Sequence, residues 1–149
     1  SKAVTKSSNP DLWRSQMISR RKIFIGSAAG AASVAVLAMP ALAAAPQPFT
    51  LAAFEAAQKA GKPILVEIHA DWCPTCKAQA PIIGELSAQP KFKDLVVFRV
   101  DFDKQTDVVR KFGAQMQSTL IVFKGAQEVG RSVGETQRAA ISALLDKVA

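Results

Sequence analysis

The sequence predicts an α/β domain built on a mixed sheet of about four strands, with helices on both faces. Short runs of branched apolar residues alternate with helical patterns along residues 50–149. The order strand, helix, strand in the first half implies parallel pairing. The last two strands, 120–123 and 128–133, are separated by four residues, a connection short enough only for an antiparallel hairpin.

The first half of the domain contains two helices and one strand. Thr50 is placed to cap a helix that ends at Gly61. The run 63–69 (PILVEIH) is rich in branched apolar residues, which predicts a buried strand. A second helix follows Cys73, and we expect Pro81 inside it to produce a kink. The apolar residues that define these helices are Leu51, Phe54 and Ala57, then Ile82, Ile83 and Leu86.

The second half begins with a strand at 95–101, followed by a helix that ends before Gly113. The hairpin comes next, and a last helix follows Gly134. In the first of these helices the apolar residues at helical spacing are Val108, Val109 and Phe112. In the last helix we expect four residues to be buried: Ala140, Ile141, Leu144 and Leu145. Residues 50–149 are therefore expected to form one domain, preceded by a short linker at 44–49.

The net charge of +7 is concentrated at the N-terminal end of the chain. Residues 1–43 hold six of the 19 basic residues but only one of the 12 acidic residues. A surface that neutralises several phosphates needs its cations clustered on the folded part. We therefore expect no binding to nucleic acid.

Residues 1–43 have the order of a secretory signal. Arg20-Arg21-Lys22 precede an apolar run, 23–39, and the small-residue cleavage site 41–43 (ALA). The arginine pair also resembles a twin-arginine export signal. We expect export to a bacterial periplasm, with Ala44 as the mature N-terminus. An uncleaved inner-membrane anchor is the alternative, because the run from residue 23 to 45 could span a hydrocarbon core of about 30 Å.

The two cysteines of the chain, Cys73 and Cys76, lie directly after a predicted strand and at the start of a helix. A helix N-terminus favours a thiolate, so Cys73 is the expected nucleophile and should be accessible to clients. Cys76, one turn later, is expected to resolve the mixed disulfide. Pro74 and Thr75 between them should tune the redox potential.

A zinc site and a static disulfide are the alternative roles for this pair. One histidine and two cysteines cannot supply, within one chain, the four ligands that zinc usually takes. A static disulfide that closes so small a loop adds little stability. Redox chemistry is therefore the favoured interpretation, with the Cys73–Cys76 disulfide as the working group and no metal or other cofactor.

The segment 72–77 (WCPTCK), with Pro81 shortly after it, resembles the active-site segment of thioredoxins. The resemblance extends over about residues 48–149. It implies a thioredoxin fold in which the first strand is reduced or missing. It also implies thiol-disulfide oxidoreductase activity, with Trp72 and Lys77 in the surroundings that tune the cysteines.

The same resemblance places Glu67 where thioredoxins keep a buried acid that exchanges protons with the resolving cysteine. Alternation along the strand independently turns Glu67 inward, where burial would raise its pKa. Arg99 stands where thioredoxins have a lysine close to this acid, so an ion pair is the alternative to a carboxyl group without a cation. His69 replaces an aromatic residue, and either favours the Cys73 thiolate or packs as a neutral imidazole.

The residues Gln117, Ser118 and Thr119 depart from the thioredoxin pattern, which places a cis-proline where Ser118 stands. A non-proline cis bond costs about 2.5 to 4 kcal/mol, so we expect Ser118 to be trans and to reshape the substrate groove at 117–119. Altered client choice is the favoured consequence. The alternative is a metal or iron-sulfur site shared by the cysteines of two chains.

The Pro-Thr dipeptide resembles that of membrane-tethered thioredoxins which reduce apocytochrome c thiols during cytochrome c maturation. We therefore expect a periplasmic reductant of client disulfides that receives electrons from a membrane thiol reductase and meets the membrane only through its N-terminal segment. The alternative functions are a disulfide-forming oxidant and a non-catalytic or metal-binding module of the same fold.

Overall fold

The computed structural model describes residues 44–149, and our expectations for the export signal and the anchor lie outside these residues. The strands are β1 (Gln47–Pro48), β2 (Pro63–His69), β3 (Val96–Asp101), β4 (Thr119–Lys124) and β5 (Gln127–Val133). The helices are α1 (Leu51–Lys59), α2 (Pro74–Ser87), α3 (Thr106–Lys111) and α4 (Arg138–Leu145), with 3-10 turns η2 (Pro90–Phe92) and η3 (Asp146–Val148).

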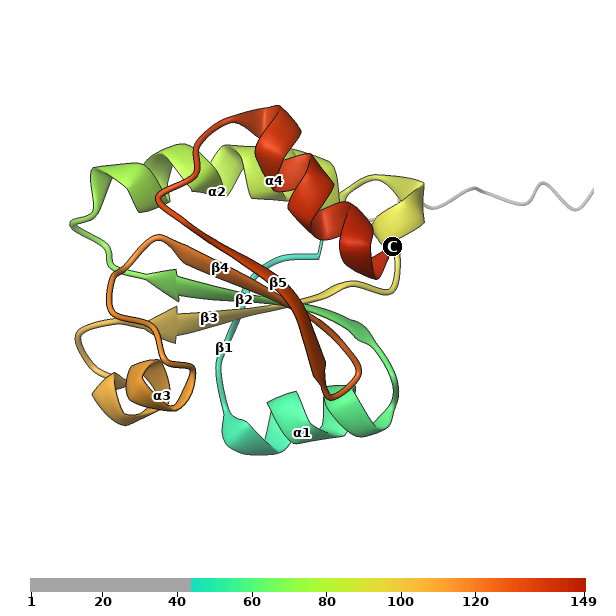
Figure 1. Ribbon diagram of the computed structural model, residues 1–149, viewed down its shortest axis with the longest axis horizontal. Coiled ribbons are helices and arrows are strands. Elements are labelled where there is room, and N and C mark those ends of the chain that lie inside the picture. Colours follow the sequence, from blue (N-terminus) through green and yellow to red (C-terminus); the bar gives the residue numbers. More distant parts are fainter. Residues whose placement is uncertain (1–43) are drawn as a thin grey trace, which may run out of the picture. The chain divides into compact units, whose positions relative to one another are not determined.

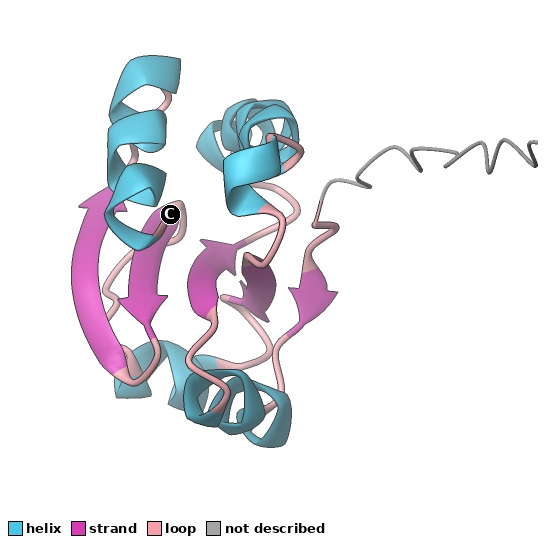
Figure 2. Ribbon diagram, turned by 90° about the vertical axis from the view of Figure 1, so that its right-hand side faces the viewer, coloured by secondary structure: helices cyan, strands magenta, loops and turns pink. Residues whose placement is uncertain are grey.

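One mixed sheet holds all five strands in the order β1-β3-β2-β4-β5. Strand β2 lies at the centre, parallel to β3 and antiparallel to β4. Strands β4 and β5 form the expected hairpin, and Gly125 in its turn has a φ of +57°, which glycine adopts without steric cost. Helices α1 and α3 cover one face of the sheet, and α2 and α4 cover the other (Figures 1 and 2). The predicted α/β class is confirmed.

The segment 44–49 contains a strand where we expected only a linker. Gln47 and Pro48 pair in parallel with Phe98 and Arg99 of β3, and Phe49 is buried in the core. The linker prediction is therefore wrong for residues 47–49. Pro48 can belong to β1 because β1 is an edge strand, where the backbone N–H that proline lacks is not required. The first strand is present but reduced, and the sheet has five strands rather than about four.

The face covered by α1 and α3 is packed with aromatic rings. Five phenylalanines form successive ring contacts with centroids 5.3 to 6.0 Å apart: Phe49, Phe54, Phe98, Phe112 and Phe123. Thr50 caps α1 as expected, because its hydroxyl oxygen accepts a hydrogen bond from the Ala53 N–H at 3.2 Å. Of the apolar residues at helical spacing in α1, Phe54 and Ala57 are buried, whereas Leu51 is 46% exposed.

The face covered by α2 and α4 buries Leu65, Ile83 and Leu86 against residues of α4. Ile141, Leu144 and Leu145 are buried as expected, but Ala140 is exposed. The prediction for Ala140 is wrong because the apolar stripe of this short helix begins one residue later. Helix α2 continues from Pro74 to Ser87 through Pro81.

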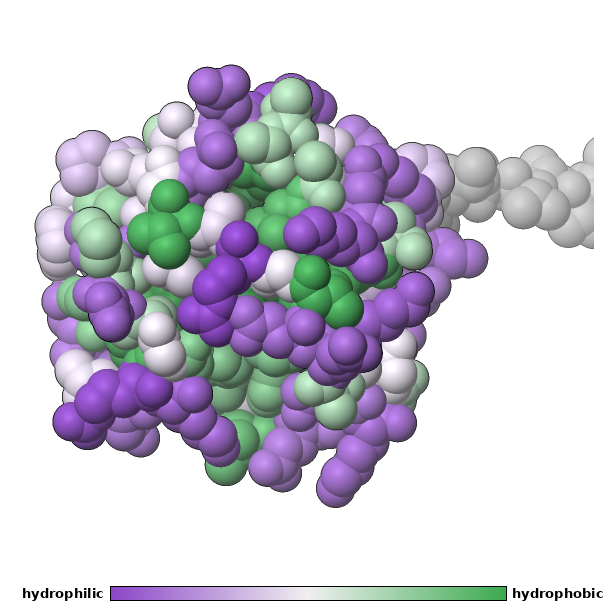
Figure 3. Space-filling model, viewed as in Figure 1, coloured by the Kyte–Doolittle hydropathy of each residue, from purple (hydrophilic) through white to green (hydrophobic). Residues whose placement is uncertain are grey.

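The surface of the described residues mixes polar and apolar side chains. Figure 3 shows hydrophobic residues interspersed among hydrophilic ones on the face seen in Figure 1. The exposed large apolar side chains are Leu51, Trp72, Met116 and Val133. Between residues 44 and 149, no helix combines the length and the apolar character needed to cross a membrane.

Candidate active site

Cys73 is the N-cap residue of α2. Its φ and ψ of −77° and 114° are extended, and Pro74 provides the first helical residue with its φ already fixed. The Cys73 sulfur accepts a hydrogen bond from the backbone N–H of Cys76 at 3.1 Å. A sulfur that accepts an N–H at a helix N-terminus is stabilised as a thiolate. The local sequence therefore places this sulfur where we expected the nucleophile.

Cys73 is less accessible than we expected. Only 1% of its surface is exposed, because it packs with Ala70, Cys76 and Phe102. The expectation of an accessible sulfur is wrong for this conformation, in which the two thiols are not joined by a disulfide. A client sulfur can reach Cys73 only after a local displacement of this cover.

Cys76 lies one turn further along α2 and is also buried. Burial raises the pKa of the Cys76 thiol, and its hydrogen bond with Cys73 and the charge on Cys73 raise it further. Backbone groups of Ala70 and Ser118 lie close enough to oppose this rise in part. Cys76 therefore holds its proton and needs a base before it can attack.

Glu67 points to the face of the sheet that α2 covers, since Ile64, Val66 and Ile68 alternate with it and face α1. It is 4% exposed. Both Nε and Nη2 of Arg99 donate to its Oε2, at 3.1 and 3.0 Å. Its Oε1 has no hydrogen-bond partner within the described part of the chain.

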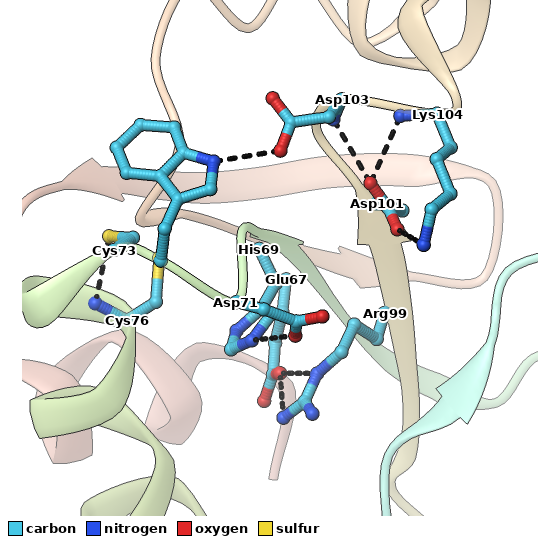
Figure 4. A network of polar contacts seen from close by, with 10 residues as sticks. Glu67, His69, Asp71, Cys73, Cys76, Arg99, Asp101, Asp103 and Lys104 are labelled. Atoms are coloured by element: carbon cyan, nitrogen blue, oxygen red, sulfur yellow. Dashed lines mark hydrogen bonds and ion pairs between the residues drawn. The ribbon is translucent and has the colours of Figure 1, made fainter.

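The structure therefore selects the ion pair with Arg99 from our two alternatives for Glu67. Burial still raises the pKa of Glu67, even though the charge and the hydrogen bonds of Arg99 lower it in part. Figure 4 shows the pair in the same view as the two cysteines. A cavity of ≈ 300 Å³ opens beside Arg99, whose side chain is 35% exposed.

His69 lines the same cavity as Arg99. Its Nε2 lies 3.4 Å from Oδ1 of Asp71. Burial and the charge of Arg99 lower the pKa of His69, although Asp71 opposes this effect. The imidazole is therefore neutral near pH 7, and the contact with Asp71, which is almost fully exposed, is not an ion pair there. The structure favours the packed neutral imidazole over a cation that stabilises Cys73.

Ser118 adopts a left-handed backbone conformation at the position where thioredoxins have proline. Its φ is +58°, and all peptide bonds of residues 44–149 are trans, as we predicted for Ser118. This conformation costs a residue with a side chain about 1 to 2 kcal/mol. Hydrogen bonds hold it, since its N–H donates to Ile68 O at 2.8 Å and its carbonyl accepts from Gly134 N at 3.0 Å.

The expected substrate groove at Gln117, Ser118 and Thr119 needs a correction. Ser118 and Thr119 are 5% and 1% exposed, so their side chains do not face a client. Thr119 begins β4, and its hydroxyl donates to Met116 O at 2.7 Å. Gln117 is half-buried, whereas Met116 is 54% exposed. The exposed side chain of this loop is thus Met116, which the sequence did not single out.

The other residues of the 72–77 segment lie at the surface around the cysteines. Trp72 is 58% exposed, and its Nε1 donates to Oδ2 of Asp103 at 2.8 Å. Pro74 and Lys77 are exposed, and Thr75 is half-buried. Asp103 follows β3 and thereby connects the loop after that strand to the active-site segment. The sequence did not predict this contact between Trp72 and Asp103, because the two residues lie 31 positions apart.

Within residues 44–149, no three side chains of the types His, Cys, Asp and Glu lie close enough together to hold a metal ion. Cys73 and Cys76 are a pair of free thiols on α2, and the buried Glu67 lies on the sheet face that this helix covers. Such an arrangement supports thiol-disulfide exchange.

The chain matches the thioredoxin family model over residues 45–147. It belongs to the thioredoxin family. Among its relatives, the thioredoxin of Mycobacterium tuberculosis strain H37Rv is 39% identical over 80 residues, which cover 54% of this chain and 68% of the relative. Thioredoxin 1 of Nostoc sp. is 35% identical over 85 residues, covering 57% of this chain and 78% of that protein.

Solved structures agree with the fold. The crystal structure of Trxlp from Edwardsiella tarda EIB202 is 46% identical, with a TM-score of 0.66, and the match covers 68% of this chain and 98% of that one. Thioredoxin NaTrxh from Nicotiana alata is 28% identical with a TM-score of 0.60, and the match covers 70% of this chain and 95% of that one. This member of the thioredoxin family is a thiol-disulfide oxidoreductase.

Proposed function

We propose that this chain is a periplasmic reductant of client disulfides, with Cys73 as nucleophile, Cys76 as resolving thiol and Glu67 as proton acceptor. The observation that carries the proposal is the different environment of the two sulfurs. Cys73 accepts the Cys76 N–H at the start of α2, whereas the Cys76 thiol is buried and its pKa is raised. The Cys73 sulfur is thus suited to attack a client disulfide, and the Cys76 sulfur keeps its proton until the mixed disulfide is resolved.

The reaction proceeds in two exchange steps. The Cys73 thiolate attacks one sulfur of a client disulfide, which forms a mixed disulfide and releases the other client sulfur as a thiolate. Cys76 then gives up its proton and attacks the Cys73 sulfur. This second step closes the Cys73–Cys76 disulfide and releases the second client thiolate, so the client gains the two electrons that the cysteine pair loses.

Glu67 is suited to accept the Cys76 proton. It lies on the sheet face that α2 covers, and burial raises its pKa towards the range in which it can exchange protons near neutral pH. Its free Oε1 is available for this proton while Arg99 holds Oε2. The cavity beside Arg99 brings solvent to the partner of this carboxylate, although neither Glu67 nor Cys76 lines it.

Location and electron donor are proposed from the sequence and from one relative. The signal-like order of residues 1–43 supports export to the periplasm. A Mycobacterium leprae relative, 36% identical over 80 residues, is a bifunctional thioredoxin reductase/thioredoxin. This supports a thiol reductase as the electron donor, and an exported protein would need one that delivers electrons across the inner membrane.

The redox potential of the Cys73–Cys76 couple tests the reductive direction. A value near the thioredoxin potential of about −270 mV is expected, whereas one near about −120 mV, typical of strong periplasmic oxidants, would contradict it. Equilibration against glutathione or dithiothreitol buffers, followed by alkylation and mass spectrometry, gives this value. Insulin reduction with dithiothreitol as electron source measures turnover, with Cys73→Ser as the inactive control.

A further inference from the structure

Gln79 is a buried polar residue on the helix that carries both cysteines. It lies three residues after Cys76 and is 3% exposed. The same side of α2 buries the apolar residues Ile83 and Leu86. An amide in such a place requires hydrogen-bond partners, because burying it without them is unfavourable.

The Gln79 amide finds these partners on two different loops. Its Nε2 donates to the carbonyl of Ser118 at 3.2 Å and to the carbonyl of Glu135 at 2.8 Å. Ser118 precedes β4, and Glu135 lies between β5 and α4. One side chain thus ties the helix of the cysteines to both loops.

The Ser118 carbonyl is a junction between these segments. It accepts from Gln79 Nε2 and from the backbone N–H of Gly134. The Ser118 backbone also lies close enough to the Cys76 thiol to affect its pKa. The contacts of Gln79 therefore reach the immediate surroundings of the resolving thiol without Gln79 itself touching a reacting sulfur.

We propose that Gln79 is a positioning residue that holds the Ser118 loop in its left-handed conformation beside Cys76, and so fixes the backbone that protein clients meet next to the cysteines. Proline restricts its own backbone at this position in thioredoxins, but serine does not. Here hydrogen bonds from α2 and from Gly134 supply the restriction. The inference deepens the proposed function, because it names a residue that determines how well a client strand fits beside Cys73.

Replacing Gln79 by an apolar side chain of similar size tests this proposal. In Gln79→Met, the Ser118 and Glu135 carbonyls lose a donor while the volume is nearly kept. We expect kcat/KM for insulin reduction to fall about tenfold, because a small displacement of positioning groups is costly. Reduction of a small aromatic disulfide, which contacts much less of the surface around the cysteines, should change less than about twofold.

Ser87→Ala is the matched control, since it removes the hydrogen bond of another buried polar side chain of α2, which donates to Gly84 O away from both loops. It should leave both activities unchanged. Equal kcat/KM for Gln79→Met and the unmodified protein would overturn the inference, and so would an equal loss with both disulfides. If the unmodified protein reduces neither substrate, the proposed function fails instead.

Hydrogen exchange in the unmodified protein tests the same inference without any variant. The side-chain amide protons of Gln79 should exchange more slowly than those of Gln127, which is exposed. Equally fast exchange at both side chains would show that Gln79 does not hold the loops.

Discussion

The two faces of the sheet are built differently. The face under α1 and α3 is a continuous apolar cluster in which phenylalanine rings pack edge to face. The face under α2 is apolar near α4, but towards the cysteines it buries Glu67, Gln79 and Ser118. Each of these three is held by specific hydrogen bonds to residues far away in the sequence.

This difference separates stability from chemistry within one small domain. Apolar packing contributes free energy of folding without restricting which groups react. Buried polar groups contribute little net stability, but they fix protonation states and loop conformations. We therefore expect substitutions under α1 to change the free energy of unfolding, and substitutions near the cysteines to change reactivity.

The largest expected effect is on turnover, from Cys73→Ser. Without this thiolate no mixed disulfide can form, so insulin reduction should fall below detection. The free energy of unfolding of the reduced protein should change by less than about 1 kcal/mol, because serine keeps the N-cap role. Denaturant unfolding and the turnover assay together check both results. A large loss of stability would show that the two faces are not separable.

Phe54→Ala should have the largest effect on stability. Its ring contacts Phe49, Phe98, Phe112 and Phe123, so the free energy of unfolding should fall by about 3 to 5 kcal/mol. Leu51→Ala, at an exposed position of the same helix, should change it by less than about 0.5 kcal/mol. The fraction of Phe54→Ala that remains folded should reduce insulin at the normal rate. Slower turnover in that folded fraction would show that packing under α1 also controls the reactivity of the cysteines.

Glu67→Gln removes the proposed proton acceptor but keeps an oxygen that can accept from Arg99. At pH 7 the release of client from the mixed disulfide should slow on the order of a hundredfold. Rapid-mixing experiments with a client followed by acid quench and mass spectrometry measure this step. Attack by Cys73 should keep its normal rate, and a loss confined to that first step would contradict the assignment.

The pH dependence of stability gives a second test of Glu67. Burial raises its pKa above the ordinary 4.5, so the native state binds this proton more tightly than the unfolded chain does. The resulting stability is fully present below about pH 4.5 and is lost as the pH rises through the native pKa. The free energy of unfolding should therefore be measured as the pH rises from about 4.5 through the native pKa of Glu67. Over this range the Glu67→Gln variant should lose less stability than the unmodified protein. Parallel curves would show that Glu67 titrates normally.

Asp103→Ala should have the smallest effect. It removes the acceptor for Trp72 Nε1, but water can replace it because the indole is exposed. The free energy of unfolding should fall by less than about 1 kcal/mol, with a change in tryptophan fluorescence. A loss above about 2 kcal/mol would mean that this contact stabilises the active-site segment more than its exposure indicates.

The fold and the cysteine site were predictable where local patterns decide them. Branched apolar residues at 63–69 define β2, and its alternation turns Glu67 inward. The position of Cys73 between a strand and a helix defines its role as N-cap. These features depend on the spacing of residues along one strand or one helix, and that spacing can be read from a single sequence.

The features that were missed depend on contacts between distant segments. Strand β1 contains a proline and has only two residues, so its pairing with β3 leaves no periodic signal. The burial of Cys73 depends on Phe102, which lies on another loop. Gln79 could have been found, since it is a polar residue on the apolar side of a predicted helix, but its two partners lie 39 and 56 residues away.

Trapping of a client tests the assignment of the two sulfurs most directly. Each single cysteine variant, Cys73→Ser and Cys76→Ser, is mixed with a disulfide-bonded client and analysed by intact-mass spectrometry without reductant. The account predicts a covalent adduct, reversible with dithiothreitol, for Cys76→Ser and none for Cys73→Ser. An adduct that forms on Cys76 in Cys73→Ser, and not on Cys73 in Cys76→Ser, would contradict it.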